Sequence, residues 1–175
     1  PADNYFVSVN AFLFLEDNDF VAEFYNNTTD ITLAVNVPVT NGVETPNINF
    51  GLALGGSIRG RVTAEIGGAT LPFAAVTTRS TTNALVFSTS LADQNGDYAV
   101  RGLKAGNYTV SAEAEGNFLT EYYNNRASAG AADPVSVTAG SATAGINLSL
   151  PAGGAVTGIT HWRKVPTAWS MRKRS

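Results

Sequence analysis

Two segments of this chain place aromatic rings directly before paired amides, a combination that can bind sugars. Residues 18–27 read NDFVAEFYNN and residues 116–125 read GNFLTEYYNN. Neighbouring residues of a strand face opposite sides of a sheet, so we expect one ring of each pair to face the core and the other to be exposed. An exposed ring could stack on a sugar while the amides bind its hydroxyls. The candidate ligand-binding residues are Tyr25, Asn26, Asn27, Tyr122, Tyr123, Asn124 and Asn125.

A structural interpretation of the same motif competes with binding, and we prefer it. Asn is a common turn residue, so each Asn pair would form a turn and the second ring would pack under the following loop. Recurrence in two copies shows that the repeated unit needs the motif, which suits structure as well as binding.

Asp93, Asn95 and Asp97 place oxygen-bearing side chains at alternate positions, as calcium loops do. No bidentate Glu follows at the spacing that such loops use, and Asn95-Gly96 is also a standard hairpin turn pair. We therefore expect a turn and no cofactor, with calcium as the alternative. The acidic residues 16–19 are expected to be solvated.

Catalysis has little support in the residue types of this chain. Nucleophilic catalysis by a Ser-His-Asp or Cys-His site needs His or Cys; the chain has no Cys, and its one His, His161, lies in an atypical tail. Paired carboxylates could cut a glycosidic bond. However, Glu23 and Glu121 occupy equivalent positions in separate copies, so we expect them to be solvated surface residues and predict no catalytic residues.

The charge of the chain disfavours nucleic acid and membrane partners. Five of the 11 basic residues lie in the last 13 positions. The rest of the chain therefore has 6 basic and 14 acidic residues. An acidic body repels nucleic acid and anionic membrane surfaces. The chain contains no 18-residue apolar run, so no membrane-spanning helix is expected.

The repeat sets the expected domain organisation. Residue 18 corresponds to residue 116, an offset of 98, and the same offset relates Gly55-Gly56 to Gly153-Gly154. An offset that persists over about 40 positions indicates a tandem module. Residues 1–54 are then the C-terminal half of a first module, 55–152 a complete module, and 153–160 the first strand of a third. Residues 161–175 form a basic tail, either a foreign reading frame or cloning remnant, or a native tail that docks on the acidic body; the start at Pro1 fits a processed piece.

Alternating apolar residues predict about seven short strands in the complete module, which indicates a β-sandwich. The expected strands are 57–63, 73–79, 84–91, 97–101, 107–115, 118–123, 135–138 and 146–150.

The first module should contain strands at 4–15, 20–25 and 48–54 but lacks its first four strands. The missing strands would leave bare edges and an apolar face, so we expect self-association through unpaired strands, with the second module or with another copy of the chain. The face would contain Phe12, Phe14, Phe20, Phe24 and Phe50.

Three segments carry a family resemblance: GGSIRGRVT from Gly55, DQNGDYAVRGLKAGNYTVSAEA from Asp93, and SVTAGSATAGINLSLPAGGAVTG from Ser136. This pattern resembles the carboxypeptidase regulatory-like domain. The resemblance implies an all-β, prealbumin-like (transthyretin-like) Greek-key β-sandwich of about seven strands, preceded here by an incomplete copy. It covers the second module and about half of the first. Members are mostly non-catalytic appendages of secreted bacterial enzymes and surface proteins.

The fold is also similar to the B-type repeats of collagen adhesins, which often carry a Lys–Asn isopeptide crosslink. The first strand of this module offers Arg59 and Arg61, and Lys104 lies in a predicted turn. We therefore predict no such crosslink.

The first functional interpretation is a non-catalytic tandem module of a secreted or cell-surface bacterial protein, acting as a spacer, a presentation module or a weak interaction module. The alternative is a carbohydrate-binding appendage of a secreted hydrolase that uses Tyr122 or Tyr123 with Asn124 and Asn125. A hydrolase is third. The expected partner is a polysaccharide or a protein surface, with no nucleic acid and no membrane.

Overall fold

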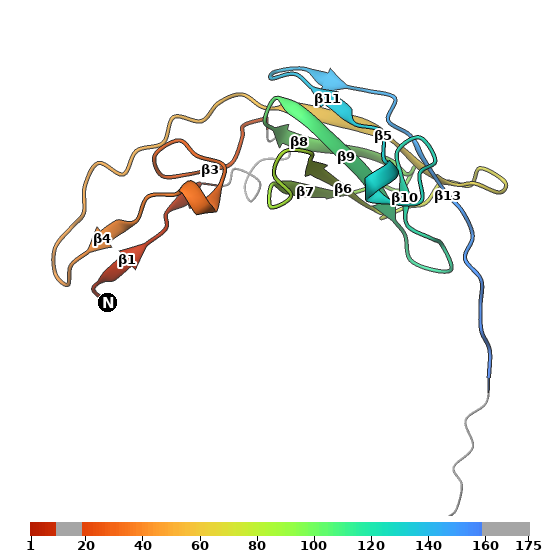
Figure 1. The fold of residues 1–175 in the computed structure, drawn as a ribbon, viewed down its shortest axis with the longest axis horizontal. Coiled ribbons are helices and arrows are strands. Elements are labelled where there is room, and N and C mark those ends of the chain that lie inside the picture. The colour runs from red at the N-terminus through yellow and green to blue at the C-terminus, as the bar shows by residue number, and fades with distance from the viewer. Residues whose placement is uncertain (10–18, 159–175) are drawn as a thin grey trace, which may run out of the picture.

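A β-sandwich forms the larger part of the molecule (Figure 1). The computed structural model describes residues 1–9 and 19–158. Within residues 55–152, one sheet has the order β10-β9-β6-β7 with β11 also on β9, and the other has β12-β5-β13 with β8 also on β5. The strands are β5 Gly56–Ala64, β6 Ala75–Ser80, β7 Phe87–Leu91, β8 Asp97–Leu103, β9 Gly106–Glu113, β10 Glu121–Tyr122, β11 Val135–Val137, β12 Ala142–Thr143 and β13 Leu148–Leu150. The predicted all-β fold is confirmed.

Alternation along the strands builds the core between the two sheets. In β9, Tyr108, Val110 and Ala112 are buried while Thr109 and Ser111 are half-buried on the other face. Each fully buried large aliphatic side chain contributes about 1.5–3 kcal/mol, so this face dominates the stability of the sandwich. Every buried member of the core cluster comes from residues 58–150.

Gly60 allows β5 to pass close to the chain that leads into β13. A Cβ atom on Gly60 would lie 1.9 Å from the carbonyl oxygen of Ile146. The same carbonyl accepts a hydrogen bond from the Tyr98 hydroxyl at 2.6 Å, and burial raises the pKa of Tyr98. This contact ties β8 to the segment that leads into β13.

Residues 1–54 form a smaller N-terminal unit that extends from one end of the sandwich (Figure 1). Its strands are β1 Asp3–Tyr5, β2 Ser8–Val9, β3 Glu23–Phe24 and β4 Val37–Val39, with a 3₁₀ turn, η2, at Ile31–Leu33. The antiparallel β1–β4 and β2–β3 pairs match the β9–β11 and β9–β10 pairs of the sandwich. The 3₁₀ turn matches η3, Ala129–Ala131. The sequence repeat is therefore also a repeat of backbone pairing.

The expected closing strand at 48–54 is wrong, because residues 48–53 form no strand and Leu54 makes only an isolated bridge with Phe20. The equivalent strand, β13, pairs with β5. Asp3 corresponds to Gly106 at the start of β9, so residues 1–54 correspond to the part of the repeat after β8 and supply no β5. A strand without its partner has no ladder to join.

Other strand limits also differ from expectation. The 84–91 and 118–123 segments shorten to β7 and β10, and β12 was not expected.

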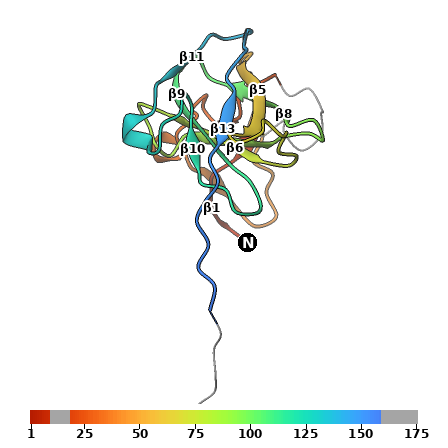
Figure 2. The ribbon, with the colours of Figure 1, turned by 90° about the vertical axis from the view of Figure 1, so that its right-hand side faces the viewer.

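No strand forms within 153–158, where the chain leaves the sandwich at the end away from the N-terminal unit (Figures 1 and 2). Phe12 and Phe14, the acidic positions 16–18, residues 159–160 and the tail with His161 lie outside the described residues.

The N-terminal unit leaves apolar residues exposed whose equivalents are buried in the sandwich. Tyr5 is 38% exposed, whereas the equivalent Tyr108 is 3% exposed. In the sandwich, β6 lies beside β9 at Tyr108, and no strand among the described residues of the N-terminal unit takes the equivalent place. Phe6 and Leu33 are exposed as well. Among the described residues, no helix is long and apolar enough to cross a membrane.

Candidate functional site at the junction of the two units

The asparagine pairs form tight turns in both copies. Asn26 and Asn27 have φ values of 75° and 59°, and Asn124 and Asn125 have φ values of 65° and 56°. Two consecutive residues with positive φ are typical of a type I′ turn, and Asn tolerates this conformation better than most residues. The turn is closed by the Tyr122 N–H, which donates to the Arg126 carbonyl at 2.8 Å. The backbone conformation of the turn therefore explains why Asn occupies both positions.

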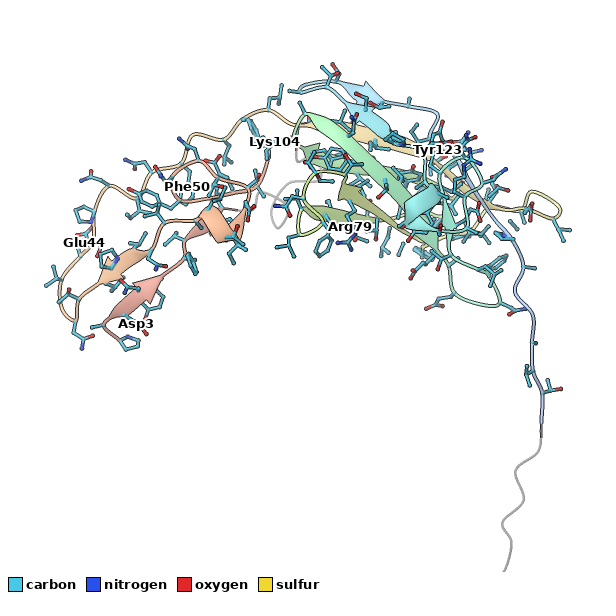
Figure 3. The ribbon with its side chains drawn as sticks, viewed as in Figure 1. Asp3, Glu44, Phe50, Arg79, Lys104 and Tyr123 are labelled. Carbon is cyan, nitrogen blue, oxygen red and sulfur yellow. The ribbon has the colours of Figure 1, made fainter. Side chains whose placement is uncertain are left out.

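The tyrosines of the motif pack against their own units. Tyr25 meets Phe50 edge to face with ring centroids 6.2 Å apart, and Tyr123 packs against the sandwich core. Figure 3 places Phe50 and Tyr123 in different units, so the two predicted ligand sets do not form one site. The contacts favour the structural interpretation of the motif, and sugar binding at these residues remains a prediction.

The carboxylate of Asp133, which lies beside the second turn, accepts hydrogen bonds from the protein itself. Asn124 Nδ2 and the Arg126 guanidinium both donate to Asp133 Oδ2. These hydrogen bonds lower the pKa of Asp133. The amide of Asn124 thus holds the loop before β11 against the turn.

The predicted calcium loop forms a tight turn between β7 and β8, which lie in different sheets. Asp93 Oδ1 accepts the backbone N–H groups of Asn95 at 2.7 Å and Asp97 at 2.9 Å. The Asp97 carboxylate accepts two hydrogen bonds from Arg61, at 2.7 and 2.8 Å, and these lower the pKa of Asp97. The described residues contain no group of three or more His, Cys, Asp or Glu arranged for a metal. Calcium binding stays a prediction to which the structure adds no support.

The prediction that Glu23 and Glu121 are solvated is wrong. Both side chains are buried, with 8% and 7% exposure. Cross-strand neighbours point to the same face of a sheet, and Glu121 pairs with the buried Ala112. Burial, together with the nearby Glu65, raises the pKa of Glu121. Glu23 Oε1 is buried without a hydrogen-bond partner in the described part of the chain.

Gly55 joins the two units without a linker. Its N–H donates to the Asp19 carbonyl of the N-terminal unit at 2.6 Å, and its own carbonyl accepts the Gly140 N–H of the sandwich at 2.9 Å. β5 begins at the next residue. A Cβ atom on Gly55 would lie 2.7 Å from the Gly102 carbonyl carbon, so the close approach requires glycine here.

Side chains reinforce this junction. Arg101 of β8 pairs with Asp19 at 3.3 Å, and Asn83 of the β6–β7 loop donates to Asp30 at 2.6 Å. Hydrogen bonds from Thr32 and Asn83 lower the pKa of Asp30. Val21, between these two contacts along the chain, is buried.

A groove of about 460 Å³ runs between the units. Figure 3 shows Lys104 at the end of the sandwich that faces the N-terminal unit. The groove combines aromatic rings, a buried carboxylate and a cation, and its lining includes Phe20, Glu23, Phe24, Phe87, Leu103 and Lys104. Sequence reasoning missed this site because its walls come from residues about 60–80 positions apart; the paired Gly55-Gly56 was the one local signal.

Comparisons with known proteins agree with the resemblance found in the sequence. The family model of the carboxypeptidase regulatory-like domain matches residues 57–151. No curated protein sequence matches the chain. A solved structure of a presumptive carbohydrate binding protein from Bacteroides uniformis ATCC 8492 is 18% identical, with a TM-score of 0.38 over 54% of this chain and 40% of that chain.

The major pilin subunit of Bacillus cereus is 12% identical, with a TM-score of 0.35 over 54% of this chain and 29% of that chain. The chain therefore spans less than half the length of either protein. The family match covers more than half of this chain, and with the sandwich described above it shows that the chain belongs to the carboxypeptidase regulatory-like domain family.

Proposed function

We propose that the chain is a non-catalytic, tandem β-sandwich segment of a secreted or cell-surface bacterial protein and acts as a spacer of fixed geometry. The observation that carries this proposal is the double role of Gly55, whose N–H is bound by one unit and whose carbonyl is bound by the other. Two units that share a hydrogen-bonded residue have no free segment about which to turn.

Ordinary glycine-rich linkers are flexible coils. Gly55 and Gly56 differ from such linkers because neighbouring backbone fills the space beside them. The Asp19–Arg101 contact reinforces the attachment at Gly55, and the Asp30–Asn83 hydrogen bond adds a second, separate point of attachment, so rotation of one unit against the other is opposed. A repeat joined in this way sets both the length and the direction of whatever it carries.

Inserting Gly-Ser-Gly-Ser between Leu54 and Gly55 tests the spacer function. We expect small-angle X-ray scattering to give one narrow distance distribution for the native chain and a broader one for the insertion variant. The matched control carries the same insertion between Gly67 and Gly68, at an open hairpin tip where an added Cβ would meet nothing within 4 Å. If the native chain gave a distance distribution as broad as that of the insertion variant, the spacer proposal would be wrong.

Carbohydrate binding is the second candidate, and we propose the groove as a second possible site beside the asparagine turns. The observation that favours it is the unpartnered Oε1 of Glu23. Because Glu23 lines the groove, rotation of its carboxylate toward the groove would let a sugar hydroxyl donate to this oxygen. A ring of Phe20 or Phe87 could stack on the sugar face, and Lys104 supplies a cation. A ligand that donates a hydrogen bond to a buried carboxylate removes the free-energy cost of leaving that carboxylate without a donor.

Titration with soluble glycans tests the groove. We expect Glu23→Gln to weaken binding by at least about tenfold, because hydrogen bonds to charged groups contribute about 1.5–3 kcal/mol. Glu121→Gln is the matched control, since it removes the equivalent buried carboxylate from outside the groove. No binding at millimolar glycan, or equal losses in both variants, would exclude this site. Screening on ester, glycoside and peptide substrates tests the third candidate, a hydrolase.

A further inference from the structure

The sandwich presents, at its far end, the same surface that the N-terminal unit uses at the junction. Val21, which lines the groove at the junction, is 8% exposed, whereas the equivalent Leu119 is 54% exposed. Thr29 and Asp30 are half-buried, and their equivalents Ala127 and Ser128 are exposed. The positions that are buried or half-buried at the junction are thus the ones whose equivalents in the sandwich are exposed.

The backbone beneath this surface is already in its docked form. Leu119 N–H donates to the Pro151 carbonyl at 2.9 Å, as Val21 N–H donates to the Ala53 carbonyl at 2.9 Å. Gly153 N–H donates to the Asn117 carbonyl at 2.8 Å, which repeats the Gly55–Asp19 hydrogen bond. Docking here requires no rearrangement of the main chain, so its ordering cost is small.

We propose that the surface formed by Leu119, Ala127 and Ser128 is the docking site for a further copy of the same module placed directly after residue 152. The incoming module would contact it through its β6–β7 loop and β8–β9 turn, because these elements cover the equivalent surface of the N-terminal unit. This inference rests on the proposed spacer function and extends it from one junction to a growing array.

The chemistry of this second surface differs from the first in a defined way. Asn117 replaces Asp19 and Ser128 replaces Asp30, so the partners of Arg101 and Asn83 lose their charge. Leu119 replaces Val21 and adds apolar area. The second junction is therefore held by apolar contact and by hydrogen bonds without an ion pair, so its docking depends less on salt than that of the first junction, where an Asp–Arg contact at a surface is screened by salt.

A chain with a second copy of residues 55–152 after residue 152 tests the docking site. ¹⁵N relaxation would report whether each module tumbles alone, and hydrogen exchange would report burial around Leu119. We expect shared tumbling of the two complete modules. Leu119→Asp should release the added copy, while Leu91→Asp, at an exposed leucine on the outer face of β7, should not. Asn117→Asp with Ser128→Asp should strengthen docking and make it sensitive to salt.

The outcomes separate this inference from the proposed function. Independent tumbling of the added copy, with residues 1–54 and the sandwich still tumbling together, overturns the docking site alone. Independent tumbling of residues 1–54 as well overturns the spacer function and the docking site together. Dispersed spectra of Leu119→Asp and Leu91→Asp would establish that both variants keep their fold, so that a difference between them reports docking.

Discussion

Asn125 holds a backbone conformation, φ 56°, that side chains with a Cβ atom normally avoid. A left-handed conformation costs most L-residues about 1–2 kcal/mol, and Gly avoids that cost. We expect Asn125→Ala to lower the free energy of unfolding by about 1 kcal/mol and Asn125→Gly to change it by less than about 0.5 kcal/mol. Urea unfolding measures both.

Asn107→Ala in β9 is the control, because Asn107 is exposed and has no positive φ. It should leave the unfolding free energy within about 0.5 kcal/mol of the native value. If Asn125→Ala were as stable as this control, the turn would no longer explain the asparagine pair and a ligand contact would become the better explanation.

Glu121 makes the stability depend on pH in a predictable direction. Burial raises the pKa of Glu121 above its usual 4.5, so the folded state holds this proton more tightly than the unfolded state does. The penalty for ionising Glu121 is absent below pH 4.5, grows as pH rises toward the folded-state pKa, and is complete above it. Protonation of this group therefore favours folding at low pH.

We expect Glu121→Gln to raise the unfolding free energy at pH 7 and to leave it nearly unchanged at pH 4, which urea unfolding at the two pH values would measure. Glu115→Gln, at an exposed position, is the control and should show no such difference. A Glu121→Gln variant that is less stable than the native chain at pH 7 would mean that the carboxylate makes a favourable contact when charged.

Sequence reasoning at this scale succeeded where a residue type has one dominant conformational use. Asn-Asn and Asn95-Gly96 were predicted as turns, and positive φ values occur at both Asn pairs and at Gly96. It failed at Glu23 and Glu121, because a charged residue suggests solvent until the strand register is known. Only the pairing with Ala112 shows that Glu121 faces inward.

At the scale of elements, Gly60 sets how closely β5 and the closing segment can approach. A methyl group there would overlap the Ile146 carbonyl, which also accepts the Tyr98 hydroxyl. We expect Gly60→Ala to lower the unfolding free energy by about 1–3 kcal/mol, because backbone atoms must move to admit the methyl group. Thermal unfolding measures this loss.

Gly130→Ala is the matched control, since a Cβ at Gly130 meets nothing within 4 Å. It should change the unfolding free energy by less than about 0.5 kcal/mol. Equal stability of the two variants would show that β5 and the Ile146 segment are not in close contact in solution.

The elements that could be predicted are those whose two-residue alternation is complete. β6, β8 and β9 lie close to their expected positions, and their inward residues are Val76 and Thr78, Tyr98 and Val100, and Tyr108 and Val110. Residues 48–54 show the limit of this method. Their alternation matches β13, yet no strand forms, because pairing depends on β5, which the pattern of one segment cannot reveal.

At the scale of the whole molecule, the two units differ in how completely their apolar residues are covered. The sandwich encloses its own core, whereas Tyr5, Phe6 and Leu33 of the N-terminal unit are exposed. The point in the repeat at which the chain begins predicted that the N-terminal unit would expose more apolar residues. The repeat could not predict the junction, because the contacts of Gly55 with Asp19 and Gly140 join segments that are distant in sequence.

The enclosed core predicts that the sandwich folds without the N-terminal unit. We expect a chain of residues 55–158 to unfold cooperatively, because its core cluster draws only on residues 58–150, and to self-associate less than a chain that keeps the N-terminal unit. A chain of residues 1–158 should self-associate as its concentration rises, because β1 and β2 lack the neighbour that β6 gives β9 and bare edges recruit other strands.

Size-exclusion chromatography with light scattering would measure both masses, and the shared end at residue 158 makes the pair a matched comparison. The predicted self-association also has an identifiable surface. Phe6→Lys adds a charge at an exposed apolar residue between β1 and β2, so it should move the 1–158 chain toward monomer. An unfolded 55–158 chain would mean that the N-terminal unit stabilises the sandwich. A 1–158 chain that stays monomeric at high concentration would mean that the apolar face is covered within one molecule.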